Sequence, residues 1–185
     1  ALTLFSTQGY VATSLADIAR ASDISKAGLL HHYSSKDQLL AAVLDERDRR
    51  IVSRLPRPEE GAEAALDAWV DMVAHNQHHP DGVALYTAMS AAVIDSKHQA
   101  HPWFREHLIG AISYLVEAFE HGKTTGEVRE DAPSEQIARR LVAISDGLQV
   151  QWLCSRADGG RTLNMHEVMA GVAVDMKERW LIRPE

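Results

Sequence analysis

The stretch TSLADIARASDISKAGLLHHYSSKDQLL, residues 13–40, decides the fold predicted for this chain. It contains two short segments of helical character, residues 15–21 and 25–32, which only Ser22-Asp23-Ile24 separates. Two short helices joined by a turn of three to four residues form a helix-turn-helix, whose second helix fits the major groove of DNA. Spacing alone does not establish this unit, because any tight helical hairpin produces it.

Two capping boxes mark helix starts around these segments. Ser14 and Asp17 form the first box, in which the hydroxyl and the carboxylate each accept a backbone N–H that the helix leaves without a partner. Ser34 and Asp37 repeat the pattern, which predicts that a fourth, longer helix starts there. Pro56-Arg57-Pro58 ends that helix, and its apolar face is formed by Leu40, Val43, Leu44, Ile51 and Leu55.

The remainder of the chain is also predicted to be helical. It has no long alternating β-branched stretch, and Pro80, Pro102 and Pro133 each stand where a helix can begin. The expected helices, including a first short one, cover about residues 1–7, 59–78, 80–96, 102–121, 133–156 and 164–181, with breaks at Gly9, Gly122 to Gly126 and Asp158-Gly159-Gly160. The predicted fold is therefore all-α, with a three-helix head containing the helix-turn-helix (residues 1–50) joined by the fourth helix to a larger body (residues 51–185).

Charge is divided unevenly between head and body. The chain has a net charge of −7, but residues 1–54 hold seven Lys and Arg against six Asp and Glu, while residues 55–185 hold twelve against twenty. A net charge of +1 allows the head to approach phosphates, and the acidic body stays away from them.

The sequence also indicates a compartment. It has no run of eighteen or more apolar residues, so neither a transmembrane helix nor a membrane partner is expected. The single Cys154 cannot form an intrachain disulfide, which suits a reducing cytoplasm. The chain begins at Ala1 without Met and without a basic lead-in, which is consistent with a trimmed start.

The second segment begins with residues suited to reading DNA. Lys26, Ala27 and Gly28 lie on its N-terminal face, and His31 follows one turn later. Small residues at positions 27 and 28 let the backbone come close to base edges or to a thymine methyl group.

The order and spacing of many residues resemble the DNA-binding head of the TetR family of transcriptional regulators, over nearly all of residues 1–50. The matched positions are Gly9-Tyr10, Thr13-Ser14, Ile18-Ala19, Ala21, Ile24-Ser25-Lys26, Leu29, His31-His32-Tyr33, Lys36 and Leu39-Leu40. The chain also resembles the last part of such a regulator's body, at Gly126-Glu127-Val128-Arg129-Glu130-Asp131, Ile137-Ala138 and Asp146-Gly147-Leu148. Residues 57–125 match only in helical character.

The resemblance implies DNA-binding roles for the matched residues of the head. Phosphate contacts would come from Thr13, Ser14 and Lys36. The recognition helix would open with Ser25, Lys26, Ala27 and Gly28, and close against backbone and bases with His31, His32 and Tyr33. The chain departs from the family at Leu30, where a Tyr often contacts phosphate, and at Ser22, which replaces the usual Gly of the turn and would have to take the geometry of that glycine.

The same resemblance implies what the protein does. It would be a homodimeric repressor, released from a palindromic operator by a small-molecule effector, and neither an enzyme nor a cofactor protein. The last two helices would form the dimer interface through small and apolar residues at helical spacing, namely Val142, Ser145, Leu148, Leu153, Val168, Gly171, Val172, Asp175 and Arg179. Periodicity by itself equally allows these residues an internal core.

An effector site in the body would be a largely apolar cavity with a few polar groups. The candidate residues are Trp69, Met72, Val73, Asn76, Tyr86, Met89, Trp103, Phe104, Leu108, Gln149 and Trp152, with His75 and Gln149 as polar handles. Aromatic and Met residues at helical spacing are also typical of a plain core.

Two other functions are compatible with these residues. His75 and His79 have the i, i+4 spacing of zinc ligands on one helix face, which would suit a metal-dependent enzyme. No acidic residue completes a His-Glu-x-x-His pattern and histidines are also favoured at helix ends, so no metal site is predicted. The third reading, a helical ligand-binding module without DNA binding, is favoured by Leu30 and the low charge of the head. Cys154 lacks an identifiable base, which favours a buried structural thiol.

Overall fold

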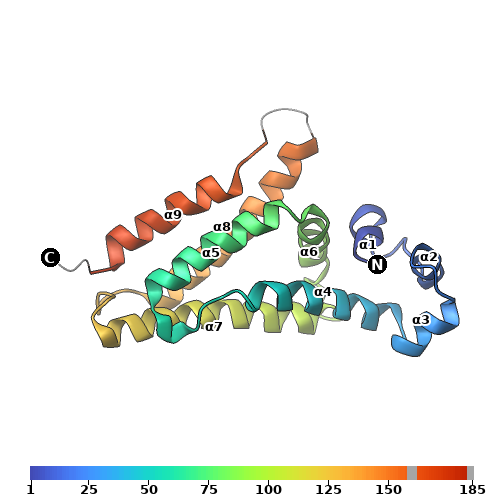
Figure 1. The fold of residues 1–185 in the computed structure, drawn as a ribbon, viewed down its shortest axis with the longest axis horizontal. Helices are drawn as coiled ribbons and strands as arrows, with labels where there is room; N and C mark the ends of the chain where they lie inside the picture. The colour runs from blue at the N-terminus through green and yellow to red at the C-terminus, as the bar shows by residue number, and fades with distance from the viewer. Residues whose placement is uncertain (158–161, 183–185) are drawn as a thin grey trace. The chain divides into compact units, whose positions relative to one another are not determined.

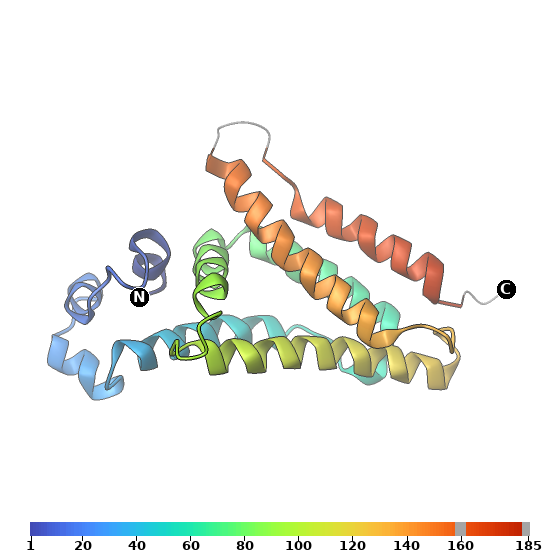
Figure 2. The same cartoon turned by 180° about the vertical axis from the view of Figure 1, so that it is seen from behind.

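The computed structural model describes residues 1–157 and 162–182, and its elements are helical (Figures 1 and 2). In order they are α1 (Leu2–Gln8), α2 (Leu15–Ala21), α3 (Lys26–His32), α4 (Lys36–Val52), the 3-10 turn η1 (Pro58–Glu60), α5 (Ala62–Gln77), α6 (Pro80–Ala92), α7 (His101–Thr125), α8 (Ser134–Ala157) and α9 (Met165–Trp180). The predicted all-α fold is confirmed. The break expected at Asp158-Gly159-Gly160 lies outside the described residues.

The chain divides into two compact units. The first contains Ala1–Val52 together with His79–Arg105, and the second contains Ser53–His78 together with Glu106–Glu185. The helices of the head therefore share their unit with α6 and with the segment that leads into α7.

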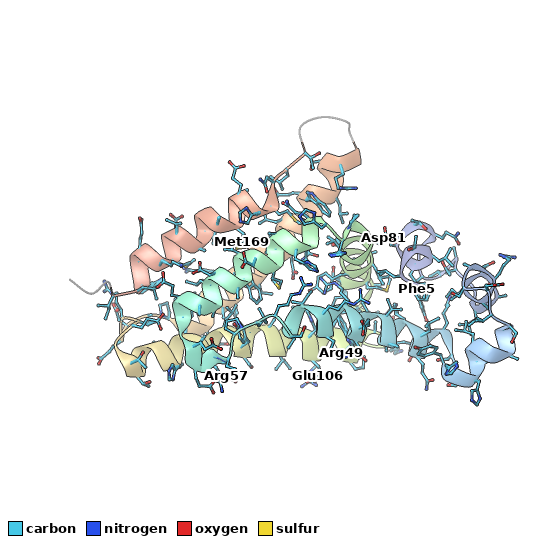
Figure 3. The ribbon with its side chains drawn as sticks, in the orientation of Figure 1. Phe5, Arg49, Arg57, Asp81, Glu106 and Met169 are labelled. Atoms are coloured by element: carbon cyan, nitrogen blue, oxygen red, sulfur yellow. The ribbon has the colours of Figure 1, made fainter. Side chains whose placement is uncertain are left out.

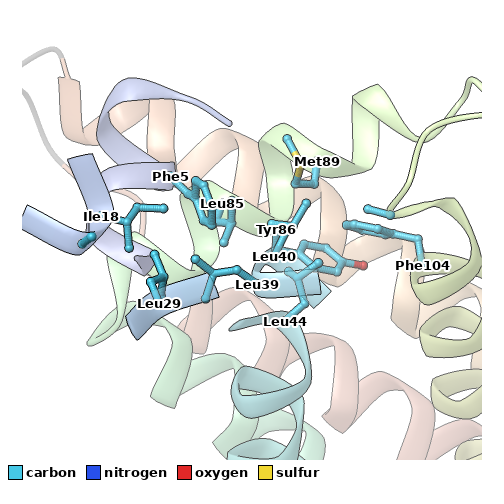
Figure 4. Packing of buried hydrophobic residues seen from close by; sticks show 12 residues of the cluster. Phe5, Ile18, Leu29, Leu39, Leu40, Leu44, Leu85, Tyr86, Met89 and Phe104 are labelled. Carbon is cyan, nitrogen blue, oxygen red and sulfur yellow. The ribbon is translucent and has the colours of Figure 1, made fainter. Parts of the chain in front are cut away.

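A common apolar core holds the first unit together (Figure 4). The helices α1, α2 and α3 have seven residues each, which is too few for a helix to be stable by itself in water. They are stabilised by one buried cluster made of Phe5, Ile18, Ala19, Leu29, Leu39, Leu40, Leu44, Leu85, Tyr86, Met89, Ala100 and Phe104. Because α6 packs against α1, a helix distant in sequence completes the core of the head.

The fourth helix begins one residue later than predicted. Ser35 caps α4, because its Oγ accepts the backbone N–H of Gln38 at 3.1 Å. The side-chain Oε1 of Gln38 in turn accepts the backbone N–H of Ser34 at 2.9 Å. The carboxylate of Asp37 accepts a hydrogen bond from the hydroxyl of Tyr10 instead of capping the helix. The predicted Ser34–Asp37 box is therefore wrong.

The predicted break at the end of α7 is displaced. Gly122 lies inside the helix, where a Cβ atom would stand 2.5 Å from Cγ2 of Val128, so the close approach of this neighbour requires a glycine. The chain turns away from the helix at Gly126, whose φ of 78° lies in the left-handed region that glycine adopts without strain.

The second unit is built around α5, the later part of α7, α8 and α9. The helix α9 packs along α5 and α8, with the buried Met169 on the side that faces α5 (Figure 3). The start of α5 is held by Glu127, whose carboxylate oxygens accept the backbone N–H groups of Ala62 at 3.0 Å and Glu63 at 2.8 Å. A carboxylate at this position satisfies free donors and complements the helix dipole. The segment after α7 therefore fixes where α5 begins.

Candidate nucleic-acid interface

The first helix of the helix-turn-helix starts at a complete capping box. The Oγ of Ser14 accepts the backbone N–H of Asp17 at 3.1 Å, and the Asp17 carboxylate accepts the backbone N–H of Ser14 at 3.1 Å. The hydrogen bonds from the hydroxyl and the backbone of Ser14 lower the pKa of the Asp17 carboxyl. The predicted box is confirmed, and it holds Ser14 at the surface at the start of α2.

In the turn between α2 and α3, Asp23 has the unusual backbone conformation. This residue has a φ of 54°, in the left-handed region that short polar side chains tolerate better than most. Ser22 has an ordinary φ of −104°, so the prediction that it takes the geometry of the usual glycine is wrong. The backbone N–H of Ile24 donates to the carbonyl of Ala19 at 3.0 Å and closes the turn.

The helix α3 is anchored on one face and exposed on the other. Its N-cap residue Ser25 accepts the backbone N–H of Gly28 at 2.9 Å. Leu29 is buried in the core of the unit with 5% of its surface exposed, whereas Lys26 and Ala27 are exposed. The first turn of α3 can therefore approach a groove while the core keeps the helix in place.

The end of α3 carries two exposed histidines. The rings of His31 and His32 meet edge to face with 5.5 Å between their centres. Tyr33 is half-buried and packs against the core cluster, so it supports the end of the helix. Leu30 is 38% exposed, whereas the neighbouring Leu29 is buried.

Thr13 has an internal position. Its side chain is buried, and its hydroxyl lies within hydrogen-bond distance of the carbonyls of Gly9, at 2.8 Å, and Leu4, at 3.2 Å. These contacts tie the end of α1 to the start of α2. Of the two residues predicted to contact phosphate here, Ser14 is the one that the structure exposes.

The ammonium group of Lys36 is bound by the head itself. Its Nζ donates to the carbonyl oxygens of Tyr10 at 2.8 Å, Thr13 at 3.1 Å and Val11 at 3.3 Å. It also lies 4.4 Å from the centre of the Tyr10 ring, a distance typical of a cation–π contact. The hydrogen bonds of Lys36 therefore connect the turn before α2 to the start of α4.

Tyr10 makes a second connection between that turn and α4. Its partial burial, together with the hydrogen bond that it donates to Asp37, raises the pKa of the phenol well above its usual value. The hydroxyl therefore stays protonated and keeps donating. Sequence reasoning missed this pair, because 27 positions separate the two residues and no local pattern joins them.

The residues predicted to line an effector site fall into both units. Tyr86, Met89, Trp103 and Phe104 belong to the first unit, where they pack with the residues of the head. Trp103 also donates from its Nε1 to the carboxylate of Asp45 at 2.8 Å. The predicted residues that belong to the second unit are Trp69, Met72, Val73, His75, Asn76, Leu108, Gln149 and Trp152.

Three buried side chains place polar atoms in the core of the second unit. The Nε1 of Trp69 donates to the Oγ of Ser145 at 2.9 Å. One turn further along α8, Gln149 is only 6% exposed, and its Oε1 has no hydrogen-bond partner. A buried amide oxygen without a hydrogen-bond partner costs free energy in the folded protein.

The structure contradicts the shared helix face predicted for His75 and His79 and the burial predicted for Cys154. The helix α5 ends at Gln77 and His79 is the N-cap residue of α6, so His75 and His79 do not share a helix face. Within the described residues, no group of three or more His, Cys, Asp or Glu side chains could hold a metal ion. Cys154 is exposed rather than buried, because it lies on the opposite side of α8 from the buried Trp152.

The last two helices carry small and apolar residues on their exposed faces. The exposed apolar residues are Val150 of α8 with Val168 and Val174 of α9, and open space surrounds Gly147 and Gly171. Three residues predicted for the dimer interface, Val142, Ser145 and Leu148, are instead buried. For these three, the internal core that periodicity equally allowed is the arrangement found.

The head of the chain matches a known family model. The family model described as bacterial regulatory proteins, tetR family, matches residues 1–43. The HTH-type transcriptional regulator UidR of Escherichia coli (strain K12) is 24% identical over 146 residues, which cover 78% of this chain and 74% of UidR. The HTH-type transcriptional repressor AcnR of Corynebacterium diphtheriae is 24% identical over 166 residues, which cover 89% of this chain and 81% of AcnR.

Solved structures share the fold along almost the whole chain. A TetR transcription regulator from Haloarcula marismortui has a TM-score of 0.79 at 23% identity and covers 96% of this chain and 92% of its own. GusR of Salmonella enterica has a TM-score of 0.74 at 23% identity, with 96% and 91% covered. A transcriptional regulator from Saccharomonospora viridis in complex with choline has a TM-score of 0.74 at 20% identity, with 98% and 94% covered.

Proposed function

Because this chain belongs to the TetR family of bacterial transcription regulators, we propose that it is a repressor whose homodimer holds a near-palindromic operator until a small molecule releases it. The observation that carries the proposal is the position of α3, in which the buried Leu29 anchors the helix while Lys26 and Ala27 stay exposed. Such a helix can enter a major groove, with polar side chains around it on the phosphates.

The proposed interface uses the exposed surface of the helix-turn-helix. Bases would be read from the first turn of α3, and phosphates would be contacted from its flanks and from the start of α2. The residues that we assign to DNA binding are Ser14, Ser25, Lys26, Ala27, Gly28, His31, His32 and Tyr33, with Thr13 and Lys36 acting through the turn that they hold.

A salt series on the intact chain tests DNA binding. The probes are a duplex from the region upstream of its own gene and a random duplex of equal length, with affinity measured by fluorescence anisotropy. We expect both affinities to fall as salt rises, because Lys26 and its neighbours displace counterions, and we expect tighter binding to the upstream duplex. Absence of salt-dependent binding to both duplexes would favour a ligand-binding module without DNA binding.

We propose that two copies pair through the exposed faces of α8 and α9. Small residues such as Gly147 and Gly171 allow two helices to approach closely, and the three exposed valines between and beside them supply apolar area. A pairing of this kind has two-fold symmetry, because the same patch is used on both copies. It would present two α3 helices to one duplex, so the operator should read as a near-palindrome.

We propose that the effector binds in the second unit and contacts Gln149. A bound molecule with an N–H or O–H group would give the buried Oε1 the partner that it lacks. The effector can weaken DNA binding only by as much as it prefers the conformation that does not fit the operator.

Replacing Gln149 tests this assignment without the effector. Gln149→Met keeps the length of the side chain and removes the unpartnered oxygen, so the free energy of unfolding in urea should rise by about 1 kcal/mol. Gln151→Met, on an exposed position of the same helix, should leave it unchanged. A loss of stability in the Gln149 variant would show that the amide serves the protein's own structure.

Replacing Lys36 tests the link between the turn and DNA binding. Lys36→Met removes hydrogen bonds to three carbonyls, so the free energy of unfolding should fall by about 2 kcal/mol, and operator and random DNA should be bound more weakly by about the same factor. Lys26→Met, on an exposed lysine of the same head, should weaken binding without loss of stability. A changed sequence preference with unchanged stability of the Lys36 variant would contradict the assignment.

The proposed function also implies a location. The described part of the chain has no helix of the length and apolar character needed to cross a membrane. We propose that the protein acts in the cytoplasm, where a repressor meets the bacterial chromosome.

A further inference from the structure

The exposed surface of α3 contains an apolar strip. Leu30 is 38% exposed although Leu29 beside it is almost completely buried, so the helix turns its second leucine toward the solvent. Ala27, three positions earlier, is also exposed and therefore lies on the same face of the helix. Together Ala27 and Leu30 form a patch whose side chains carry no hydrogen-bonding group, which we call the apolar strip.

The strip lies between polar residues. Lys26 precedes it and His31 follows it, and both are exposed. A lysine can donate to phosphates or to the acceptor atoms of guanine, but the strip can do neither. Each base pair shows a different pattern in the major groove, and the one apolar group on those edges is the C5-methyl of thymine.

We propose that the apolar strip reads a thymine, with Leu30 determining the specificity of the protein at one position of each operator half-site by packing on the thymine methyl group. This inference depends on the proposed insertion of α3 into the major groove. The Tyr often found at this position in the family donates to phosphate, which a leucine cannot do. In this chain a contact with a base would therefore replace a contact with the DNA backbone.

The experiment begins with selection of duplexes from a randomised library by the intact protein, which defines the half-site. Each thymine of the half-site is then replaced by deoxyuridine, which removes only the methyl group. At one thymine per half-site we expect affinity to fall about 4-fold, the effect of exposing one buried methyl. Replacing that T·A pair by 5-methylcytosine·G, with plain C·G as the reference, should show a gain of similar size from the methyl group.

Variants of Leu30 connect the methyl effect to the strip. In Leu30→Ala the deoxyuridine penalty at that thymine should shrink to less than 2-fold, while Leu30→Met should keep most of it. Ile94→Ala, which truncates an exposed apolar side chain outside the helix-turn-helix, should keep the full penalty. Leu30 is partly exposed, so Leu30→Ala should lower the unfolding temperature only slightly, while Leu30→Met and Ile94→Ala should keep the value of the parent protein.

Two results would overturn the inference in different ways. A palindrome without any methyl-sensitive thymine, or a penalty that Leu30→Ala leaves intact, would reject the reading by the strip while the DNA-binding function stands. Failure of the intact protein to enrich any sequence would reject the proposed function, and the inference with it.

Discussion

Ala27→Glu is expected to lower the affinity for both operator and random DNA by about 100-fold or more, while the stability of the protein stays unchanged. Ala27 is exposed at the second position of α3, where the small side chain allows the backbone to approach base edges. A glutamate would bring a longer side chain into this space and a negative charge toward the phosphates. Like charges opposed across an interface cost several kcal/mol, which accounts for an effect of this size.

The control for this variant is Ala91→Glu. Ala91 is an exposed alanine on α6, so the substitution adds the same charge to a helix that is not expected to meet DNA. Its affinity for DNA should stay within about 3-fold of the parent, because a distant charge is screened by salt. Equal losses in the two variants would mean that net charge, and not the position of α3, decides binding.

Val174→Glu is expected to convert the dimer into a monomer and to weaken operator binding by about 100-fold. Val174 is 51% exposed on the outer face of α9, next to the open space at Gly171. In the proposed interface it meets the second copy, where burying a carboxylate carries a large desolvation penalty. With the pairing lost, each half-site would bind one head on its own, without the gain that comes from linking two heads.

Sedimentation measured at micromolar concentration distinguishes the two states of the Val174 variant. Val52→Glu, at an even more exposed valine on α4, serves as the control and should remain dimeric. If the Val174→Glu protein is still a dimer, the interface must lie on another surface of the protein. A parent protein that is itself monomeric would reject the proposed pairing altogether.

Local chemistry explains why the start of α2 could be predicted and the start of α4 could not. Ser14 and Asp17 form their box with backbone groups only three residues away. Near α4 two serines and two suitable acceptors follow one another, and the choice is made by Tyr10, which binds Asp37 from a distant part of the chain. A cap is therefore predictable when nothing remote competes for its side chains.

The helix faces of the body show the limit of periodicity. The apolar residues of α8 do not lie on a single stripe, so the sequence did not distinguish the buried Ser145 and Leu148 from the exposed Val150 and Cys154. The assignment depends on which neighbours reach each face, for example Trp69, whose indole binds Ser145. Contacts of this kind are set by packing between helices distant in sequence.

The same limit applies to the effector candidates. Helical spacing groups the aromatic and Met residues together, but Tyr86, Met89 and Phe104 complete the core of the head because its three short helices need apolar cover. Gln149 is one of the two polar handles predicted for the site, and the structure shows it buried with an unpartnered oxygen. Helical spacing alone therefore does not separate core residues from candidates for an effector site.

The most direct test of the central claim compares two duplexes. One is the selected palindrome, and the other has five base pairs inserted at its centre, which turns the half-sites to opposite faces of the DNA. A two-fold dimer with an α3 helix in each of two major grooves should bind the first duplex at least about 100-fold more tightly, and as one dimer per duplex. Equal affinity for the two duplexes, or saturation by a single copy of the chain, would contradict it.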